Sequence, residues 1–366
     1  MKKRVLIDLT SLDDNFSGIE HYALYITKEL IKNPDFDFEL IFKNKVSHFE
    51  PDELKHLKTT ILAGDRYEVL LKKIPNYIDK AKPDYTLFMA FPPSFLWKPK
   101  KGTKVISVIH DLVAFDVPKT MSFKSCVYYR KSIKHQVRIS THLVANSKFT
   151  ASRVIDKFHV SPDKITIAYC ASSMPSIEKS KEEIQKKYFL PNHYLLGLST
   201  LEPRKNFGTL ISWMTKVWMD DSTIPDLALV GRKGWKIGKI LEGVPETLKS
   251  KIHFTGFVDE EDIFSVYKYA DTFIFPSIYE GFGIPILEAA QTGQLPLCSK
   301  IPTSVEIMGK DYPFFFELDD FDGFVKNLFA ILKNDSDKEK LAGEVQKEAQ
   351  KFNWRDSSKK VLMLLE

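Results

Sequence analysis

The chain contains little cysteine, and the cysteines form no pattern. Cys126, Cys170 and Cys298 are odd in number, lie far apart, and lack the C-x-x-C or Cys/His spacing of metal ligands. This arrangement argues against both a disulfide framework and a zinc site. We therefore expect three small core residues and a site without a metal.

Long apolar runs are also missing. After the basic start Met1 to Arg4 the chain passes at once into the strand pattern Val5 to Leu9, with no segment long enough for a signal peptide or a bilayer span. Repeats at solenoid or propeller spacing and low-complexity tracts are absent as well. We expect a cytoplasmic protein.

The excess of positive over negative charge is small too. A net charge of +5 over 366 residues is too small to indicate a nucleic-acid partner. Residues 97–138 are nevertheless strongly basic, with ten Lys or Arg against two Asp and with aromatic residues within or beside the range. The basic residues are Lys98, Lys100, Lys101, Lys104, Lys119, Lys124, Arg130, Lys131, Lys134 and Arg138, and the aromatic ones are Phe95, Trp97, Tyr128 and Tyr129. Such a region is either a solvated face or a surface for an anionic membrane.

Short β-rich runs alternate with longer helical patterns from end to end, which predicts an α/β protein with parallel sheets. One series of strands is expected at Arg4–Leu9, Phe38–Phe42, Tyr85–Met89, Val105–His110, His142–Ala145 and Ile165–Ala168. A second is expected at Tyr194–Leu198, Leu227–Val230, Ile252–Phe254, Thr272–Phe275, Leu295–Cys298 and Phe314–Phe316. A polar stretch between the two series predicts a domain boundary near Ser172.

The segment Tyr279 to Gly293, Y-E-G-F-G-I-P-I-L-E-A-A-Q-T-G, follows an expected buried strand. It predicts a loop at the carboxyl end of that strand, where ligands bind in open α/β sheets. Pro285 suits the first turn of a helix. The amides of Gly283, Ile284, Ile286 and Leu287 would then point out of the helix start as an anion site.

Two carboxylates flank this turn, Glu280 on the loop and Glu288 about one helical turn in. A carboxylate repels phosphate but accepts strong hydrogen bonds from neutral hydroxyls. We therefore predict that both bind sugar or ribose hydroxyls of one ligand. The alternative is that Glu280 caps backbone amides and Glu288 is solvated.

The segment S-T-L-E-P-R-K-N follows the first strand of the second series. Pro203 turns the chain, Asn206 can cap the next helix, and Arg204 and Lys205 stand at its start. A cation about 4 Å from a phosphate gains roughly 4 kcal/mol at a partly screened dielectric. The pair is thus a candidate diphosphate site, although such pairs in surface loops are commonly only solvated.

The remaining candidate ligand contacts each lie in a single loop. A helix opens at Gly18, with Ser17 as its possible cap, and this loop either approaches a phosphate or forms a plain cap. His110 ends a strand, and either Asp111 orients its ring towards a sugar or the ring is a structural histidine at the strand end. Gly231 to Trp235 holds two cations near a diphosphate or in solvent, and Gly256-Phe257-Val258 could bind a base or form a plain turn.

No G-x-G-x-x-G follows Leu9 or Leu198, which disfavours a nicotinamide oxidoreductase.

Together these segments resemble glycosyltransferase family 4, the retaining nucleotide-sugar transferases. The resemblance covers nearly the whole chain, and its strongest part is E-G-F-G-I-P-I-L-E-A. Supporting segments follow in the expected order: S-G-I-E-H-Y, V-I-H-D-L, V-A-N-S-K-F-T-A-S, V-S-P-D-K-I-T-I-A-Y, T-L-E-P-R-K-N and F-N-W.

The resemblance implies the GT-B fold, with two facing Rossmann-like domains and a deep interdomain cleft. Residues 1–172 would form an acceptor-binding domain, to which a C-terminal helix within 352–366 returns, and residues 173–351 a donor-binding domain.

It also implies roles for single residues. Glu280 and the amides of Phe282, Gly283 and Ile284 would hold the donor hexose, and Glu288 the ribose. The remaining roles are His110 near the reacting end, Arg204, Lys205 and Gly18 at the diphosphate, and Phe257 with Val258 at the base.

Three departures from the family pattern concern the acceptor and the diphosphate. Ser199-Thr200 replaces a frequent Gly-Arg, Cys170-Ala171 replaces Asn-Gly, and His21 replaces a frequent Arg. We therefore expect Arg204 to act in place of the missing arginine and acceptor handling to differ.

The implied reaction is transfer of a hexose from a nucleotide-diphosphate sugar to a hydroxyl, with retained configuration and without a metal or other cofactor. T-L-E-P-R-K-N is similar to mannosyltransferase-type members and favours GDP-mannose over UDP- or dTDP-sugars. The expected acceptor is a glycan or lipid-linked glycan of a surface polysaccharide, reached at the inner face of the plasma membrane. The alternatives are a non-hydrolysing sugar-nucleotide epimerase and a catalytically silent sugar-nucleotide-binding protein.

Overall fold

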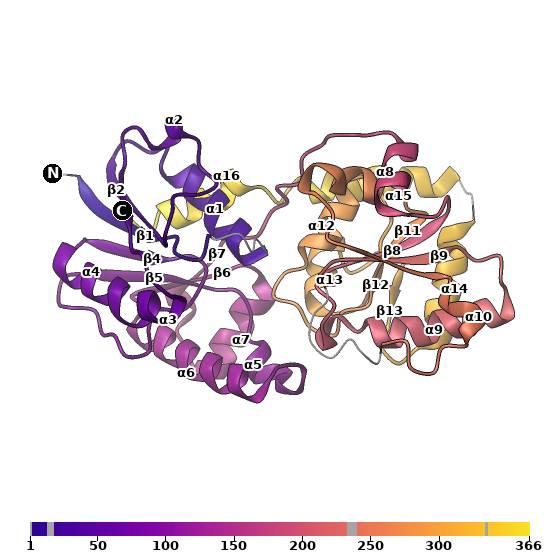
Figure 1. Ribbon diagram of the computed structural model, residues 1–366. Coiled ribbons are helices and arrows are strands. Elements are labelled where there is room, and N and C mark those ends of the chain that lie inside the picture. The colour runs from indigo at the N-terminus through magenta and orange to yellow at the C-terminus, as the bar shows by residue number, and fades with distance from the viewer. Residues whose placement is uncertain (1, 13–17, 233–239, 334–335) are drawn as a thin grey trace. The chain divides into compact units, whose positions relative to one another are not determined.

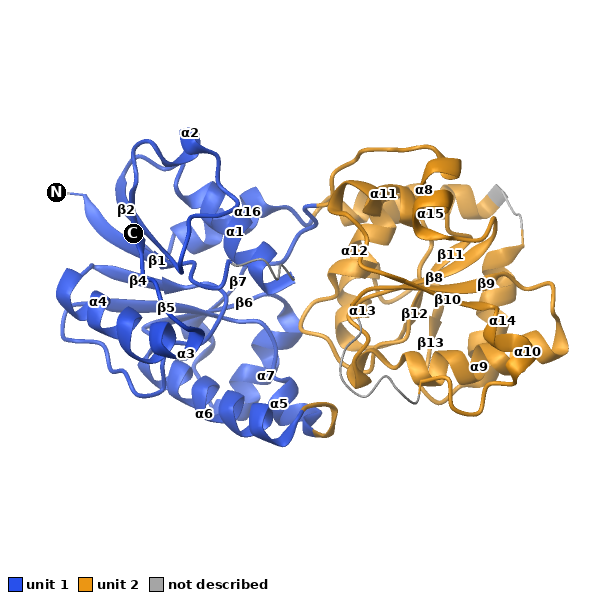
Figure 2. Cartoon of the chain, viewed as in Figure 1, with its two compact units in different colours: residues 1–118, 122–173, 352–366 blue, residues 119–121, 174–351 orange. Residues whose placement is uncertain are grey.

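The structure is a computed structural model that describes residues 2–12, 18–232, 240–333 and 336–366. The chain folds into two compact units (Figure 2). Unit 1 comprises Met1–Pro118, Ser122–Ser173 and Phe352–Glu366, and unit 2 comprises Lys119–Met121 and Met174–Lys351.

Unit 1 is built on a parallel sheet with the strand order β3-β2-β1-β4-β5-β6-β7 (Figure 1). Its central strands are buried on both faces, as expected when helices cover both sides of a parallel sheet. The strands are β1 (Lys3–Asp8), β2 (Phe36–Phe42), β3 (Lys58–Ile61), β4 (Tyr85–Phe88), β5 (Lys104–Ile109), β6 (His142–Ala145) and β7 (Ile165–Ile167).

Serine residues start two of the unit 1 helices. Ser122 accepts a hydrogen bond from the amide of Ser125, and Ser147 accepts one from the amide of Thr150. The helices are α1 (Gly18–Leu30), α2 (Pro51–Leu54), α3 (Arg66–Glu68), α4 (Ile74–Ala81), α5 (Val113–Asp116), α6 (Phe123–Ile139), α7 (Lys148–Phe158) and α16 (Trp354–Leu362), with a π-helical turn at Val69–Lys73.

Unit 2 repeats this architecture with the strand order β10-β9-β8-β11-β12-β13. The strands are β8 (Tyr194–Leu198), β9 (Asp226–Val230), β10 (Ile252–Gly256), β11 (Thr272–Phe275), β12 (Leu297–Ser299) and β13 (Phe315–Phe316). The helices are α8 (Lys181–Tyr188), α9 (Phe207–Asp220), α10 (Glu246–Lys249), α11 (Ile263–Lys268), α12 (Ile284–Gln291), α13 (Pro302–Met308), α14 (Phe321–Leu332) and α15 (Ser336–Ala349). Trp213 of α9 packs on Phe324 of α14 with ring centroids 5.1 Å apart, so these two helices share one face.

All twelve predicted strands are present, and most of their ends agree to within one or two residues. The sequence did not predict β3. Its residues K-T-T-I are mostly exposed at the sheet edge, so they lack the apolar pattern that marks the buried strands.

The predicted return of the C-terminal segment to the first domain is confirmed. Helix α16 starts at Asn353, whose Oδ1 accepts a hydrogen bond from the Asp356 amide at 2.9 Å. Trp354 stacks on Tyr25 of α1 with centroids 5.7 Å apart, and Val361 is fully buried. The segment is thus a structural part of unit 1.

All three cysteines are free and buried, as predicted. None of the helices in the described part of the chain combines the length and apolar character needed to span a bilayer.

Candidate functional site

The candidate site lies at the carboxyl ends of β8 and β11. These strands pair in parallel, with Leu195 opposite Thr272. The strand order reverses between them, because β9 and β10 continue on one side and β12 and β13 on the other. Loops that leave neighbouring strands at such a point diverge and open a crevice for ligands.

The loops after these two strands are joined through their backbones. Pro203–Lys205 forms a 3₁₀ turn after β8, and the Ile278 amide, after β11, donates to the carbonyl oxygen of Arg204 at 2.9 Å. The Arg204 guanidinium also donates to the carbonyl oxygen of Tyr279 at 3.3 Å. The two motifs singled out in the sequence therefore meet in one place.

Asn206 stands at the start of α9, as predicted, but its side chain does not cap the helix amides. Its backbone is left-handed, with φ of 59°, and its Oδ1 accepts a hydrogen bond from the Thr209 hydroxyl at 2.7 Å. The predicted side-chain cap is therefore wrong.

Glu280 forms ion pairs with both cations of the other loop. Its Oε2 lies 2.5 Å from Arg204 Nη1, and its Oε1 lies 2.6 Å from Lys205 Nζ. Glu280 and Lys205 are only 6% and 8% exposed, respectively. Glu202 adds a second carboxylate, 2.7 Å from Arg204 Nε. Two carboxylates and two cations thus form one charge-balanced cluster.

These contacts determine the charge of Glu280. Burial acts to raise the pKa of this carboxyl, but the adjacent Arg204 and Lys205 outweigh burial and lower the pKa to about 2. Burial and the neighbouring Arg204 lower the pKa of Lys205, against the attraction of Glu280. Glu280 is therefore an anion at neutral pH, and its charge is held by two cations.

Gly283 begins α12 with φ of +120°, a conformation that favours glycine. The amides of Ile286 and Leu287 both donate to the Gly283 carbonyl, at 3.0 and 3.4 Å, so the prediction that they point out of the helix is wrong. Among the described residues, the amides of Gly283 and Ile284 have no acceptor. The anion site at this helix start is therefore smaller than predicted.

Glu288 is the fifth residue of α12 and is half-buried. Burial raises the pKa of its carboxyl to about 7, although the Tyr267 hydroxyl donates to Oε2 at 3.1 Å and acts to lower the pKa. Glu288 thus titrates near neutral pH, unlike Glu280.

The loop after β9 packs tightly against the loops of its neighbouring strands. The Gly231 amide donates to the carbonyl oxygen of Gly256 at 2.8 Å. A Cβ at Gly231, where φ is +141°, would lie 2.0 Å from the carbonyl oxygen of Ser199. Only glycine fits here, so Gly231 can present only backbone to a ligand.

The two residues assigned to the base differ in exposure. Phe257 is 60% exposed, and the Arg232 guanidinium lies over its ring at 5.3 Å. Val258 is 3% exposed and belongs to the core. Phe257 therefore offers an exposed ring, whereas the buried Val258 could offer a ligand only its backbone. Lys233 to Trp235 of the predicted loop lie outside the described residues.

The remaining predicted site residues belong to unit 1. Gly18 is the first residue of α1, and its predicted cap Ser17 lies outside the described residues. His110 follows β5, and its Nε2 bonds to the carbonyl oxygen of Met89 at 2.8 Å. Asp111 instead accepts a hydrogen bond from the Val113 amide, so the prediction that it orients the His110 ring is wrong.

Burial lowers the pKa of His110 to about 4, although the bond to Met89 acts to raise the pKa. The ring is therefore neutral at pH 7. Its Nε2 carries the proton donated to Met89, which leaves Nδ1 as a hydrogen-bond acceptor.

The sequence did not indicate Tyr267, which contacts Glu288, and it indicated Arg232 only as a loop cation and not its contact with Phe257. Arg232 lies in a predicted loop, but nothing in its spacing relates it to Phe257. In the described ranges no group of three or more His, Cys, Asp or Glu side chains is placed to hold a metal ion.

Comparisons with known proteins agree with this architecture. The family model "Glycosyl transferases group 1" matches residues 180–352. The chain is 28% identical over 278 residues to O-antigen chain mannosyltransferase B of Escherichia coli, a match that covers 75% of the chain and 72% of that protein. It is 30% identical over 200 residues to O-antigen chain mannosyltransferase RfbU of Salmonella typhimurium, covering 55% of the chain and 53% of that protein.

Among solved structures, the crystal structure of Anabaena Alr3699/HepE in complex with UDP and glucose is similar over 99% of both chains, with a TM-score of 0.72. Its sequence identity to the chain is 14%, so the likeness concerns the fold.

Proposed function

We propose a specific reaction for this chain, on the premise that it is a glycosyltransferase of the GT-B fold whose residues 180–352 match the family model "Glycosyl transferases group 1". It transfers a hexose from a nucleotide-diphosphate sugar to a hydroxyl of a glycan or lipid-linked glycan during surface polysaccharide synthesis. The cluster of Glu280, Arg204 and Lys205 at the strand-order reversal of unit 2 carries this proposal.

The cluster suits a ligand with a diphosphate beside a polyol. A diphosphate offers Arg204 and Lys205 a stronger anionic partner than one carboxylate, because it carries more charge and more acceptor oxygens. Glu280, partly relieved of its cations, then accepts hydrogen bonds from hexose hydroxyls. Glu288 takes the ribose hydroxyls, and Phe257 lies against the base.

The proposed chemistry retains the anomeric configuration. The bond between the anomeric carbon and the phosphate oxygen breaks, the acceptor oxygen bonds to the same face, and its proton passes to the departing phosphate oxygen. Arg204 and Lys205 stabilise the charge on that oxygen and serve in place of a metal ion. Both carboxylate oxygens of Glu280 are held by Arg204 and Lys205, which supports a positioning role for it. Trapping a glycosyl adduct on Glu280 would overturn this mechanism.

The donor we propose is GDP-mannose. Two relatives are named O-antigen chain mannosyltransferases, which supports both the transferred sugar and a polysaccharide acceptor. A thermal-shift panel of UDP, GDP, dTDP, ADP and their sugar conjugates tests the base. Transfer from the selected donor to a glycan acceptor, assayed with and without EDTA and with the product anomer assigned by NMR, tests the rest. Release of an epimer from the donor alone, or binding without turnover, would contradict the proposal.

Nucleotide-sugar affinity should depend on pH through Glu288. The pKa of this carboxyl is about 7, so its ionised fraction, the better acceptor for ribose hydroxyls, rises from about a tenth at pH 6 to about nine tenths at pH 8. We expect the affinity for the intact nucleotide sugar to rise about tenfold over this range, measured by calorimetry. The intact sugar conjugate is the proper ligand, because the terminal phosphate of a free diphosphate itself titrates near pH 6.

Glu288→Gln is the control, and it should remove most of the pH dependence. Without ligand, a rise in pH has the opposite effect, because it lowers the stability of the folded protein instead of raising an affinity. Because the folded-state pKa lies above the ordinary value of 4.5, ionising Glu288 costs the folded state stability as the pH rises through 7. A wild-type affinity that does not change between pH 6 and 8 would contradict the assignment of Glu288 to the ribose hydroxyls.

We further propose that unit 1 lies on an anionic membrane surface through α6. The exposed side of this helix carries basic residues, no acidic ones, and the 84% exposed Phe123. Its exposed basic residues are Lys124, Arg130, Lys131, Lys134 and Arg138. Trp97, one of the aromatic residues of the predicted basic region, is 5% exposed and donates to Asp79, so it does not contribute to this surface.

Binding to vesicles that contain phosphatidylglycerol should fall as salt rises. Lys131→Glu with Lys134→Glu should weaken it by about tenfold or more, because each cation near such a surface contributes about 1 kcal/mol. Lys340→Glu with Lys347→Glu on α15 is the matched control in unit 2. Equal binding to neutral and anionic vesicles would contradict the proposed membrane contact.

A further inference from the structure

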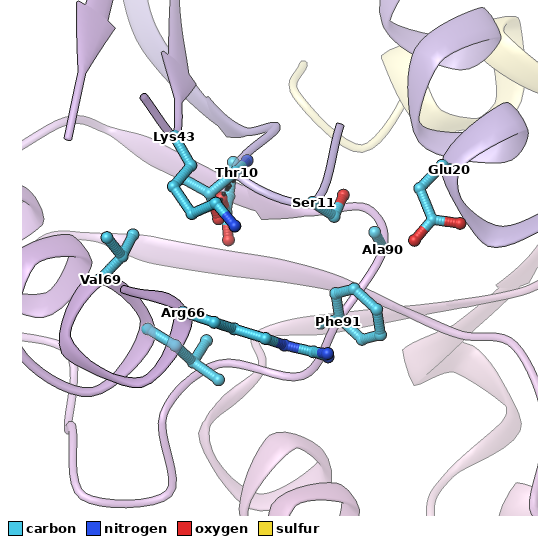
Figure 3. Close-up of a pocket in the computed structure, with 10 residues that line it drawn as sticks. Thr10, Ser11, Glu20, Lys43, Arg66, Val69, Ala90 and Phe91 are labelled. Carbon is cyan, nitrogen blue, oxygen red and sulfur yellow. Dashed lines mark hydrogen bonds between the residues drawn. The ribbon is translucent and has the colours of Figure 1, made fainter. Parts of the chain in front are cut away.

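Unit 1 contains a pocket at the carboxyl ends of three neighbouring strands (Figure 3). Asp8 ends β1, Lys43 follows β2, and Phe91 follows β4. Arg66 of α3 and Glu20 of α1 also line it, together with the hydroxyl residues Thr10 and Ser11. The pocket encloses about 130 Å³, a size that suits one small ring.

The pocket occupies the ligand position of its sheet. The strand order of unit 1 reverses between β1 and β4, as that of unit 2 reverses between β8 and β11. Asp8 at the end of β1 thus corresponds in its own sheet to the loop after β8 that carries Lys205. The reversal point is where open α/β sheets bind ligands.

Asp8 is a side chain in this pocket that has an unused hydrogen-bond acceptor. It is 7% exposed, and only its Oδ1 is bonded, to the amide and hydroxyl of Thr10 at 3.0 and 2.7 Å. Among the described residues Oδ2 has no donor. Because Oδ2 is not among the fully buried unpaired side-chain atoms, it keeps accessible surface and can accept a hydrogen bond from a group in the pocket. A hydroxyl in the pocket would supply the missing bond.

The opposite side of the pocket is flat and cationic. The Arg66 guanidinium lies 4.8 Å from the ring centroid of Phe91 and extends along it (Figure 3). An aromatic ring edged by donors suits a sugar, whose C–H groups contact the ring while its oxygens accept hydrogen bonds.

The charges of the pocket favour a neutral occupant over an anion. Among the described residues that line it, the ionisable side chains are Asp8, Glu20, Lys43 and Arg66, so two cations are balanced by two carboxylates there. A phosphate entering here would meet the buried Asp8 and the 6% exposed Glu20, and like charges in a desolvated site repel strongly. A sugar hydroxyl can instead donate to a carboxylate and accept from a cation at once.

We propose that this pocket binds one neutral sugar ring of the acceptor glycan. Asp8 accepts a hydrogen bond from a ring hydroxyl, and Arg66 with Phe91 holds the ring from the other side. That the bound sugar belongs to the acceptor rests on the function proposed above, whereas the binding of a sugar ring by unit 1 does not.

The test uses the whole chain and measures binding directly. The probes are the methyl glycosides of mannose, glucose, galactose and N-acetylglucosamine at millimolar concentration, followed by ligand-observed NMR, with inorganic phosphate as the anionic competitor. We expect at least one glycoside to bind without competition from phosphate. Asp8→Asn should weaken that glycoside about tenfold or more, since a hydrogen bond to a charged group is lost.

Two further variants separate binding from folding. Arg66→Ala changes an exposed residue and should also weaken the glycoside, with thermal unfolding nearly unchanged. Asp37→Asn removes the same charge from an exposed position near the start of β2, at the other end of the strand from the pocket, and should change neither quantity. In transfer assays Asp8→Asn and Arg66→Ala should raise KM for the acceptor while leaving nucleotide affinity intact.

Failure of the proposal is distinct from failure of the proposed function. Glycoside binding that survives both substitutions, the absence of any glycoside binding, or displacement of the glycoside by phosphate would overturn the pocket assignment even if transfer is observed. Loss of transfer with intact, Asp8-dependent glycoside binding would instead count against the proposed reaction.

Discussion

Replacing Glu280 with glutamine should reduce hexose transfer by about 100-fold or more, the range found when one group that stabilises a transition state is removed. The substitution keeps the shape of the side chain but leaves the buried Lys205 and the adjacent Arg204 without their shared anion. Removing one partner of a buried pair costs about 3 kcal/mol or more. We therefore also expect a lower Tm without ligand, and a larger stabilisation by a nucleoside diphosphate than in the wild type.

The pH supplies an internal check on the cause of this instability. The pKa of Glu280 is about 2 in the folded protein, against an ordinary value of 4.5, so its stabilising charge is present above pH 4.5 and is lost as the pH falls towards 2. The stability difference between wild type and Glu280→Gln should therefore shrink in acid. Glu246→Gln, at an 85% exposed carboxylate of the same unit, is the matched control and should behave as wild type. Full transfer activity in Glu280→Gln would contradict a role of Glu280 in the transfer reaction.

Replacing Lys205 with methionine should weaken nucleoside diphosphate binding by about 100-fold. A buried cation near a phosphate contributes a few kcal/mol, and each 1.4 kcal/mol corresponds to about tenfold in Kd. The free nucleoside should bind Lys205→Met as it binds the wild type, because it brings no phosphate. Titration calorimetry with both ligands measures the difference.

Lys216→Met on α9 is the matched control, since Lys216 is exposed on the helix that follows. The two site variants should move diphosphate affinity in opposite directions. Glu280→Gln frees both cations from a competing anion, whereas Lys205→Met removes one of them. Equal losses in both variants would indicate general damage to the loops and would contradict a diphosphate site.

The strands of this protein are predictable because their signal is local. A strand buried on both faces, such as Thr272–Phe275, is a short apolar run that needs no partner to be seen. The edge strand Lys58–Ile61 is visible only through its pairing with β2. Its residues face solvent, so no burial pattern marks them.

The parts of the site were predictable, but their contacts were not. Glu280 and Lys205 were each identified from loops that follow strands, yet they lie 75 residues apart in the sequence. Their ion pair depends on β8 pairing with β11, a non-local choice that no local pattern encodes. From the sequence, two carboxylates and two cations were assigned to a bound ligand. In the structure, both cations already form ion pairs with Glu280 and Glu202.

Proximity in sequence misled at His110. Adjacent residues of an extended chain point to opposite sides, so Asp111 is badly placed to hold the ring of its neighbour. The carbonyl of Met89, at the end of the next strand in the sheet, holds it instead.

Unit 1 takes residues from both ends of the chain, and this has a consequence for biosynthesis. During translation, all of unit 2 has been made once Lys351 is added, but α1 must wait for Trp354 to cover Tyr25. Domains commonly fold as they leave the ribosome, so the later-encoded unit can mature first. The amino-terminal sheet would remain incompletely covered longest, which makes it the part of a nascent molecule most in need of a chaperone.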